Sequence, residues 1–145
     1  MKKQSVALFL VLLLGAAPAL ASSVGSVKNV AGDAWIVRAD QPLPAVPGMR
    51  LTALDRLRTG SDGAIGSILQ DDTLLSIGPE SEISLAEYVF QPESSRFGMS
   101  IKILKGTFSY LSGTMAKLAP ESVKIETPVG MVAVRGTHFL VKVDE

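Results

Sequence analysis

The sequence predicts an all-β protein: a single compact domain of many short strands, arranged as a sandwich or a solenoid-like fold, with at most one short helical turn. Apolar and polar residues alternate over segments of about five residues, which is the period of a half-buried strand. Turn-forming residues recur roughly every 8 to 12 residues. The chain has no cysteine, so packing and strand pairing alone must hold this fold.

Residues 1–21 are predicted to be a secretory signal peptide, cleaved before Ser22. Two lysines near the start precede an unbroken apolar run at Val6–Leu14, and small residues follow, ending in Ala19-Leu20-Ala21. The apolar run is short for a membrane span, which needs about 20 residues, and no transmembrane helix is expected in the mature chain. Residues 22–145 then form one exported β domain, and its predicted location is the periplasm.

The charge of the mature chain argues against nucleic acid as a partner. The full chain carries 14 basic and 14 acidic residues, and the leader removes two of the basic ones, which leaves a net charge of −2. No basic cluster remains to contact a phosphate backbone. The lack of cysteine also excludes thiolate metal sites and attachment as a lipoprotein.

The first part of the mature chain predicts two short strands, at residues 24–30 and 34–38, joined by a turn at Ala31-Gly32-Asp33. Three prolines at positions 42, 44 and 47 then predict a loop over residues 40–48, because proline is excluded from helices and internal strands.

Short strands alternating with turns continue through the middle of the chain. Turn residues group at three places: Thr59–Gly63, Asp71-Asp72-Thr73 and Gly78–Ser81. Strands are expected between and after these turns: up to Leu69, over residues 74–77, and through Ile83 and Leu85. Residues 91–98 are polar and predict an exposed loop. Residues 100–104 alternate as a strand, and Gly106 permits a bend after it.

Near the C-terminus, residues 114–118 predict the single helical turn, which Pro120 stops. Strict alternation at residues 123–127 predicts a strand, followed by a turn at Pro128-Val129-Gly130. In the next segment Val132 and Val134 share one phase, whereas Phe139, Val141 and Val143 share the other. The change of phase falls at Arg135-Gly136-Thr137 and predicts a β-bulge there. The bulge is either an architectural kink or a feature that aims Arg135 at a partner.

Residues with catalytic potential are few. His138 is the only histidine, so a metal site built from several histidines within one chain is excluded, and any Ser-His-Asp triad would have to use His138. Asp71 and Asp72 are interpreted as turn-forming residues rather than as a catalytic pair of carboxylates. No loop has the spacing of a calcium motif, and no glycine-rich phosphate loop opens a helix. No cofactor is therefore expected.

The order of several short motifs resembles the FecR domain family. Gly48, Leu51 and Asp55 precede the Thr59-Gly60 turn, and Asp71-Asp72-Thr73 stands where the family has an Asp-Gly-Ser/Thr turn. Aspartate replaces the usual glycine at position 72. The residues singled out as structural family positions are Thr59, Gly60, Asp71, Thr127, Pro128, Arg135, Gly136, Thr137 and Phe139.

This resemblance implies a fold that begins with a first hairpin, and a non-catalytic role in signalling at the cell envelope. The best-known members also carry a cytoplasmic anti-sigma segment and a transmembrane helix, in place of which this chain has the predicted leader. Two main hypotheses follow: a periplasmic interaction or signal-sensing module that binds an envelope or outer-membrane protein, and, less favoured, a hydrolytic envelope enzyme. A third is a glycan-binding module that stacks sugars on Trp35, Tyr88 or Tyr110.

Overall fold

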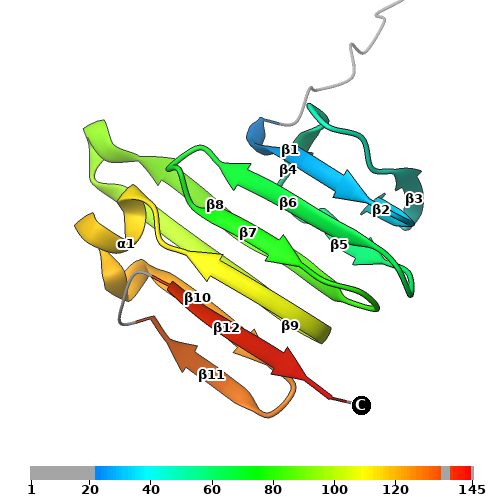
Figure 1. Cartoon of the computed structure of the whole chain (residues 1–145). Helices are drawn as coiled ribbons and strands as arrows, with labels where there is room; N and C mark the ends of the chain where they lie inside the picture. The colour runs from blue at the N-terminus through cyan, green and yellow to red at the C-terminus, as the bar shows by residue number, and fades with distance from the viewer. Residues whose placement is uncertain (1–21, 135–137, 145) are drawn as a thin grey trace, which may run out of the picture.

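The structure is a computed structural model, which describes residues 22–134 and 138–144. Its twelve strands form one continuous sheet that curls into two halves (Figure 1). Half A has the order β4 (Arg50–Thr52), β1 (Ser23–Ala31), β6 (Ala64–Leu69), β7 (Leu74–Ile77), the end of β9 (Arg96–Leu111) and β12 (His138–Val143). Half B has the order β3 (Gln41–Pro44), β2 (Ala34–Arg38), β5 (Arg56–Thr59), β8 (Glu82–Gln91), the start of β9, β10 (Val123–Thr127) and β11 (Gly130–Ala133).

The long strand β9 belongs to both halves and makes the fold continuous. Its first part pairs with β8, and from Gly106 onward it pairs with β12, joined by β7 from Phe108. The change of partner occurs at Gly106, whose φ of +87° favours glycine. A Cβ atom at this position would lie 2.1 Å from Ser81 Oγ, so the bend also requires the absence of a side chain.

Several tight turns carry the chain from one half to the other. The turns after β1, β4, β5 and β7 each connect a strand of one half to a strand of the other half. Six of the eleven pairs of consecutive strands are therefore not neighbours in the described sheet. The expected first hairpin is wrong for this reason: β1 pairs with β4 and β6, whereas β2 pairs with β3 and β5.

The two halves enclose a single apolar core. Strand β6 shows the pattern, because Ile65, Ser67 and Leu69 are buried while the residues between them are partly exposed. Each large apolar side chain in this core contributes about 1.5–3 kcal/mol by leaving water. The largest fully buried side chains include Tyr110, Phe108, Ile36, Leu51, Leu57, Ile65, Leu75, Ile83, Leu85, Met99, Ile101 and Ile103.

The predicted fold class is confirmed: one all-β domain with a single short α-helix in the described residues, α1 (Thr114–Leu118). Two 3₁₀ turns, η1 (Pro92–Ser94) and η2 (Pro120–Ser122), accompany it. Within the described residues no helix has both the length and the apolar character that a membrane span needs.

Two predicted loops are wrong in part. Residues 41–44 form strand β3 instead of a loop, and the strand tolerates Pro42 and Pro44 because it lies at the edge of half B. Residues 91–98 contain only a short connection, since β8 runs to Gln91 and β9 begins at Arg96. The polar residues suggested a loop, but they form the exposed end of the β8–β9 hairpin.

The predicted β-bulge at Arg135-Gly136-Thr137 lies outside the described residues. The strands on either side of it have different partners: β11 pairs with β10 in half B, and β12 pairs with β9 in half A. The alternation predicted for β12 is confirmed, since Phe139, Val141 and Val143 are partly buried and Lys142 is exposed.

Candidate functional site

The family residues around Thr59 hold two chain crossings together. Thr59 Oγ1 donates a hydrogen bond to the carbonyl of Gly78 (2.6 Å) and accepts one from the backbone N–H of Ser81 (2.9 Å). Ser81 Oγ in turn accepts from the N–H of Thr107 (2.9 Å), just after the bend of β9. The N–H of Gly60 donates to the carbonyl of Asp33 (2.9 Å). These residues fix the turns, and their hydrogen-bonding groups are occupied in doing so.

Asp71 is a buried centre of polar contacts, with 1% of its surface exposed. Its carboxylate accepts hydrogen bonds from the hydroxyl of Tyr88 (3.0 Å) and from Oγ1 (2.8 Å) and N (3.3 Å) of Thr73. A fourth bond comes from the N–H of Met115 (3.1 Å), in the first turn of α1. The local turn was predicted, whereas the contacts with Tyr88 and Met115 join segments that are distant in sequence. Asp71 therefore anchors α1 and β8 to the same turn.

Two tyrosines next to Asp71 are held in their neutral form. Burial and the negative charge of Asp71 raise the pKa of Tyr88 far above its ordinary value. The same two causes raise the pKa of Tyr110 to about 12. Tyr88 exchanges hydrogen bonds with Asp71, whose N–H donates to the phenol oxygen (2.9 Å). The hydroxyl of Tyr110 has no hydrogen-bond partner among the described residues.

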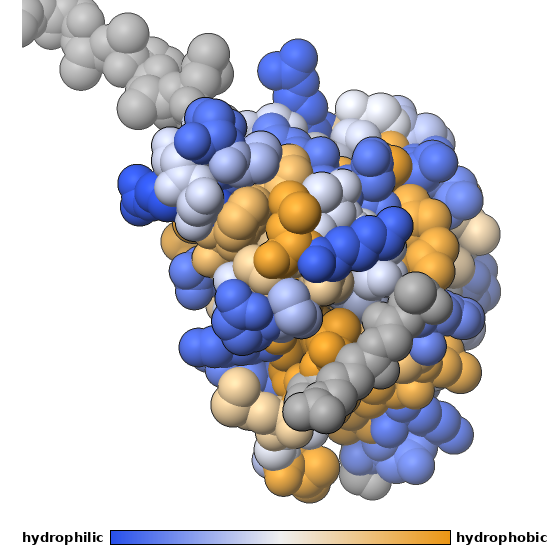
Figure 2. All heavy atoms as spheres, turned by 90° about the vertical axis from the view of Figure 1, so that its left-hand side faces the viewer, coloured by the Kyte–Doolittle hydropathy of each residue, from blue (hydrophilic) through white to orange (hydrophobic). Residues whose placement is uncertain are grey.

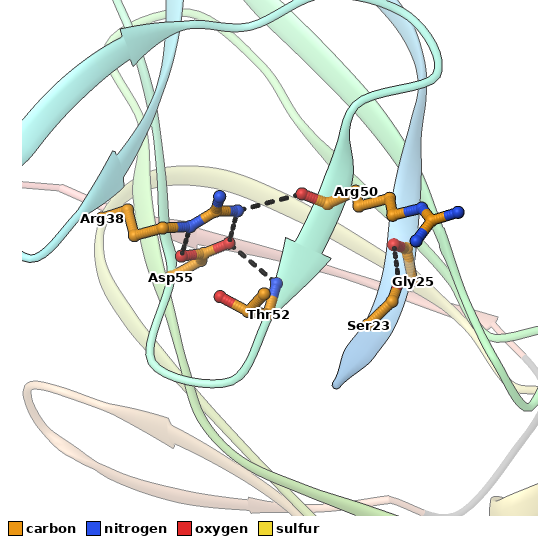
Figure 3. A network of polar contacts seen from close by, with 6 residues as sticks. All are labelled: Ser23, Gly25, Arg38, Arg50, Thr52 and Asp55. Atoms are coloured by element: carbon orange, nitrogen blue, oxygen red, sulfur yellow. Dashed lines mark hydrogen bonds and ion pairs between the residues drawn. The ribbon is translucent and has the colours of Figure 1, made fainter. Parts of the chain in front are cut away.

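Asp55 forms the second buried carboxylate contact, shown in Figure 3. Arg38 Nε donates to Oδ1 (2.9 Å) and Arg38 Nη2 to Oδ2 (2.7 Å), while the N–H of Thr52 donates to Oδ2 (2.8 Å). Arg38 Nη2 also donates to the carbonyl of Arg50 (3.0 Å). The hydrogen bond to Asp55 raises the pKa of Arg38, so the guanidinium stays charged. The sequence indicated Asp55 as a family position but gave no sign of Arg38.

The remaining described family positions also have structural contacts. Thr127 Oγ1 donates to the carbonyl of Gly130 (2.9 Å) and accepts from the N–H of Val129 (3.3 Å), which closes the turn at Pro128 between β10 and β11. The ring of Phe139 stacks on Tyr110, with centroids 4.9 Å apart. Arg135, Gly136 and Thr137 lie outside the described residues.

The described geometry gives no support to the catalytic triad or to the metal site considered from the sequence. His138 Nε2 lies 3.2 Å from Ser109 Oγ on the outer surface of half A, but no described carboxylate is hydrogen-bonded to this histidine. Within residues 22–134 and 138–144, no three His, Asp or Glu side chains converge on a point where a metal ion could bind.

The three aromatics proposed as a sugar platform do not share a surface. Trp35 is half-buried under the guanidinium of Arg58, 5.4 Å from its ring centre. Tyr88 is bonded to Asp71, and Tyr110 is fully buried.

An apolar groove lies beside β11, between β10, β11 and η2. Its volume is about 600 Å³, and it is lined by Val123, Lys124, Met131, Val132, Val134, Pro120 and Glu121. Met131 is 63% exposed on the edge strand β11, and Leu118 in α1 is 58% exposed. Figure 2 looks onto the end of the molecule that carries α1 and shows apolar surface broken by hydrophilic side chains. The sequence reasoning did not identify this groove, because it depends on how β10, β11 and η2 come together.

A second groove, of about 580 Å³, adjoins the family residues Thr59 and Gly60. Its charged lining residues are of both signs, Lys105 and Lys142 against Glu80 and Asp144, so it has no preference for a ligand of one charge.

Comparison with known proteins gives one result. No curated protein and no solved structure matches the chain. The family described as FecR protein matches residues 55–145, which covers more than half of the sequence and includes Asp71 and its contacts with Tyr88 and Met115. The chain therefore belongs to the FecR family.

Proposed function

We propose that this protein is a non-catalytic interaction or signal-sensing module of the bacterial envelope, exported to the periplasm, and that it binds an envelope or outer-membrane protein. The observation that carries the proposal is the apolar groove beside the edge strand β11. Membership of a regulatory family supports the signalling part of the proposal.

The groove combines the two features that recognition of an extended segment needs. The outer edge of β11 has no strand partner among the described residues, so its backbone can accept an added strand. Met131 and Val132 on β11, together with Val123 on β10, offer apolar contacts beside that edge. A partner strand would gain hydrogen bonds from the backbone and selectivity from these side chains.

Capture of the partner from an envelope extract tests this function. The tagged chain from Ser22 onward, which contains every described strand, serves as bait, and mass spectrometry identifies the captured proteins. Met131→Asp places a charge in the groove and is expected to abolish capture of the specific partner. Val46→Asp is the matched control, since Val46 is also exposed (54%) but lies in the loop between β3 and β4. Equal capture by both variants would refute the groove as the binding site.

Export is tested separately. N-terminal sequencing of the protein recovered from its host is expected to begin at Ser22, because the small residues before it fit a signal-peptidase site. An intact Met1 would contradict the periplasmic part of the proposal.

A further inference from the structure

The terminal strand β12 differs from the other three strands that end the sheet, β3, β4 and β11. Free edges invite pairing with other chains, and proteins protect them with proline, short length or charge. Strand β3 contains two prolines, and β4 has three residues and begins with Arg50, so both are protected. Strand β11 is open but has only four residues, which is enough for a short added segment. Strand β12 has six residues without proline or glycine, and its register with β9 is regular throughout. Among the four strands that end the sheet, it is the longest and has the most regular register.

The core is also incompletely covered at this edge. Phe139, Val141 and Val143 point toward the core and pack against it, yet they stay only partly buried. In the described residues β12 pairs with β9 alone, so its other side is free of strands. A further strand with apolar residues on its inner face would cover these three side chains and extend half A by one step.

We propose that this added strand is β12 of a second copy, paired antiparallel, with Val141 facing its own symmetry mate on a two-fold axis. Antiparallel pairing of identical strands has this symmetry, so each copy covers the other. The inner residues then match: Phe139 lies opposite the mate's Val143, and the two Val141 side chains meet. The interface lies on half A, apart from the groove of half B, and does not depend on the proposed function.

The charges on and next to β12 select this register. With Val141 on the axis, His138 lies opposite the mate's Asp144, so an imidazole meets a carboxylate. With Leu140 on the axis, His138 would lie opposite the mate's Lys142. With Lys142 on the axis, two lysines would face each other, which is unfavourable. Only the register centred on Val141 sets an acidic group opposite His138 and leaves Lys142 opposite an uncharged residue, Leu140.

The far edge of half A explains why association would stop at two copies. Pairing through β12 joins two halves into one longer sheet whose ends are the two β4 strands. Each β4 is three residues long and contains Arg50, so it offers little backbone and a charge to the next chain. A closed dimer follows, instead of a growing fibre.

The oligomeric state tests the proposal, with charge at Leu140 as the probe. Leu140 is 67% exposed, so charged substitutions there leave the fold intact, which a thermal melt checks. In sedimentation experiments on the chain from Ser22 onward, the parent is expected to dimerise. Leu140→Lys creates two like-charged pairs with Lys142 and should weaken the dimer roughly tenfold, whereas Leu140→Glu should strengthen it. Adding Lys142→Glu to Leu140→Lys should restore it, and Val46→Lys should have no effect.

Cross-linking tests the register directly, because the chain has no cysteine of its own. Leu140→Cys and Lys142→Cys place single thiols at positions that face each other across the axis. A mixture of the two variants should react with a short thiol cross-linker faster than either variant alone. A monomeric parent, or equal weakening by Leu140→Lys and Leu140→Glu, would overturn the proposal. The proposal would also be wrong if the chain stayed monomeric and β12 instead paired with a strand of a different protein.

Discussion

Replacement of Asp71 by asparagine tests the buried carboxylate, because the side chain keeps its shape but loses its charge and one of its two acceptor oxygens. Each carboxylate oxygen accepts one hydrogen bond from a hydroxyl and one from a backbone N–H: Oδ1 from Tyr88 and the N–H of Thr73, Oδ2 from Thr73 Oγ1 and the N–H of Met115. The amide of asparagine has one acceptor oxygen and one N–H₂ group. Whichever way the amide turns, its N–H₂ group faces a backbone N–H.

The cost can be worked out from these contacts. A hydrogen bond to a charged group contributes about 1.5–3 kcal/mol, and a buried donor without a partner costs about 1–3 kcal/mol. Asp71→Asn should therefore lower the free energy of unfolding by about 3–5 kcal/mol, a large share of the total stability of a small domain.

Urea denaturation, followed by the fluorescence of the single tryptophan Trp35, measures the change. Asp72→Asn is the matched control, because Asp72 is exposed and has a φ of +67°, a conformation that asparagine accepts. The control should stay within about 0.5 kcal/mol of the parent. If Asp71→Asn did so too, the carboxylate would not be the anchor of α1 and β8.

Four other predictions concern single substitutions. Gly106→Ala should cost at least about 2 kcal/mol more than Gly48→Ala in a urea melt, because both glycines have φ near +87° or +86° but only Gly106 lies against Ser81. Tyr88→Phe should cost about 1–3 kcal/mol at neutral pH because it leaves Asp71 short of a partner, whereas Tyr110→Phe should be nearly neutral. A tyrosine whose pKa is raised in the fold stabilises it below the ordinary pKa and loses that stability as pH rises. For Tyr110 this loss falls between pH 10.0 and about 12. Phenylalanine cannot ionise, so the free energy of unfolding of Tyr110→Phe should rise relative to that of the parent as the pH increases through this range. Gly136→Val, from the sequence phase slip alone, should lower stability by roughly 2 kcal/mol, and a variant as stable as the parent would mean that no bulge is present.

Local pattern was enough to predict several elements with their bounds. The strands at Leu74–Ile77 and Val123–Thr127 and the helix at Thr114–Leu118 agree with the structure residue for residue. In each case the signal lies inside the segment or within a few residues of its end. Pro120, for example, ends the helical pattern because it disfavours a helical conformation in the residue before it.

The pairing of strands could not be predicted in the same way. The turn at Asp33 suggested a hairpin, but β1 and β2 lie in different halves, where β1 pairs with β4 and β6 and β2 pairs with β3 and β5. The partners of Asp71 are 17 and 44 residues away, and Arg38 is 17 residues from Asp55. Alternation indicates which face of a strand is buried, and it carries no information on which strand lies alongside.

Most of the described family residues lie apart from the proposed binding surfaces, and Phe139 on β12 is the exception. Thr59, Asp71 and Thr127 use their polar atoms on turns, and these contacts fix how the chain crosses between the two halves. The groove beside β11 and the edge of β12 consist of side chains that this frame leaves open, such as Met131 and Leu140. Changes at those side chains would alter what is bound without disturbing the frame. The partner of this chain therefore has to be inferred from its exposed edges instead of from the family motif.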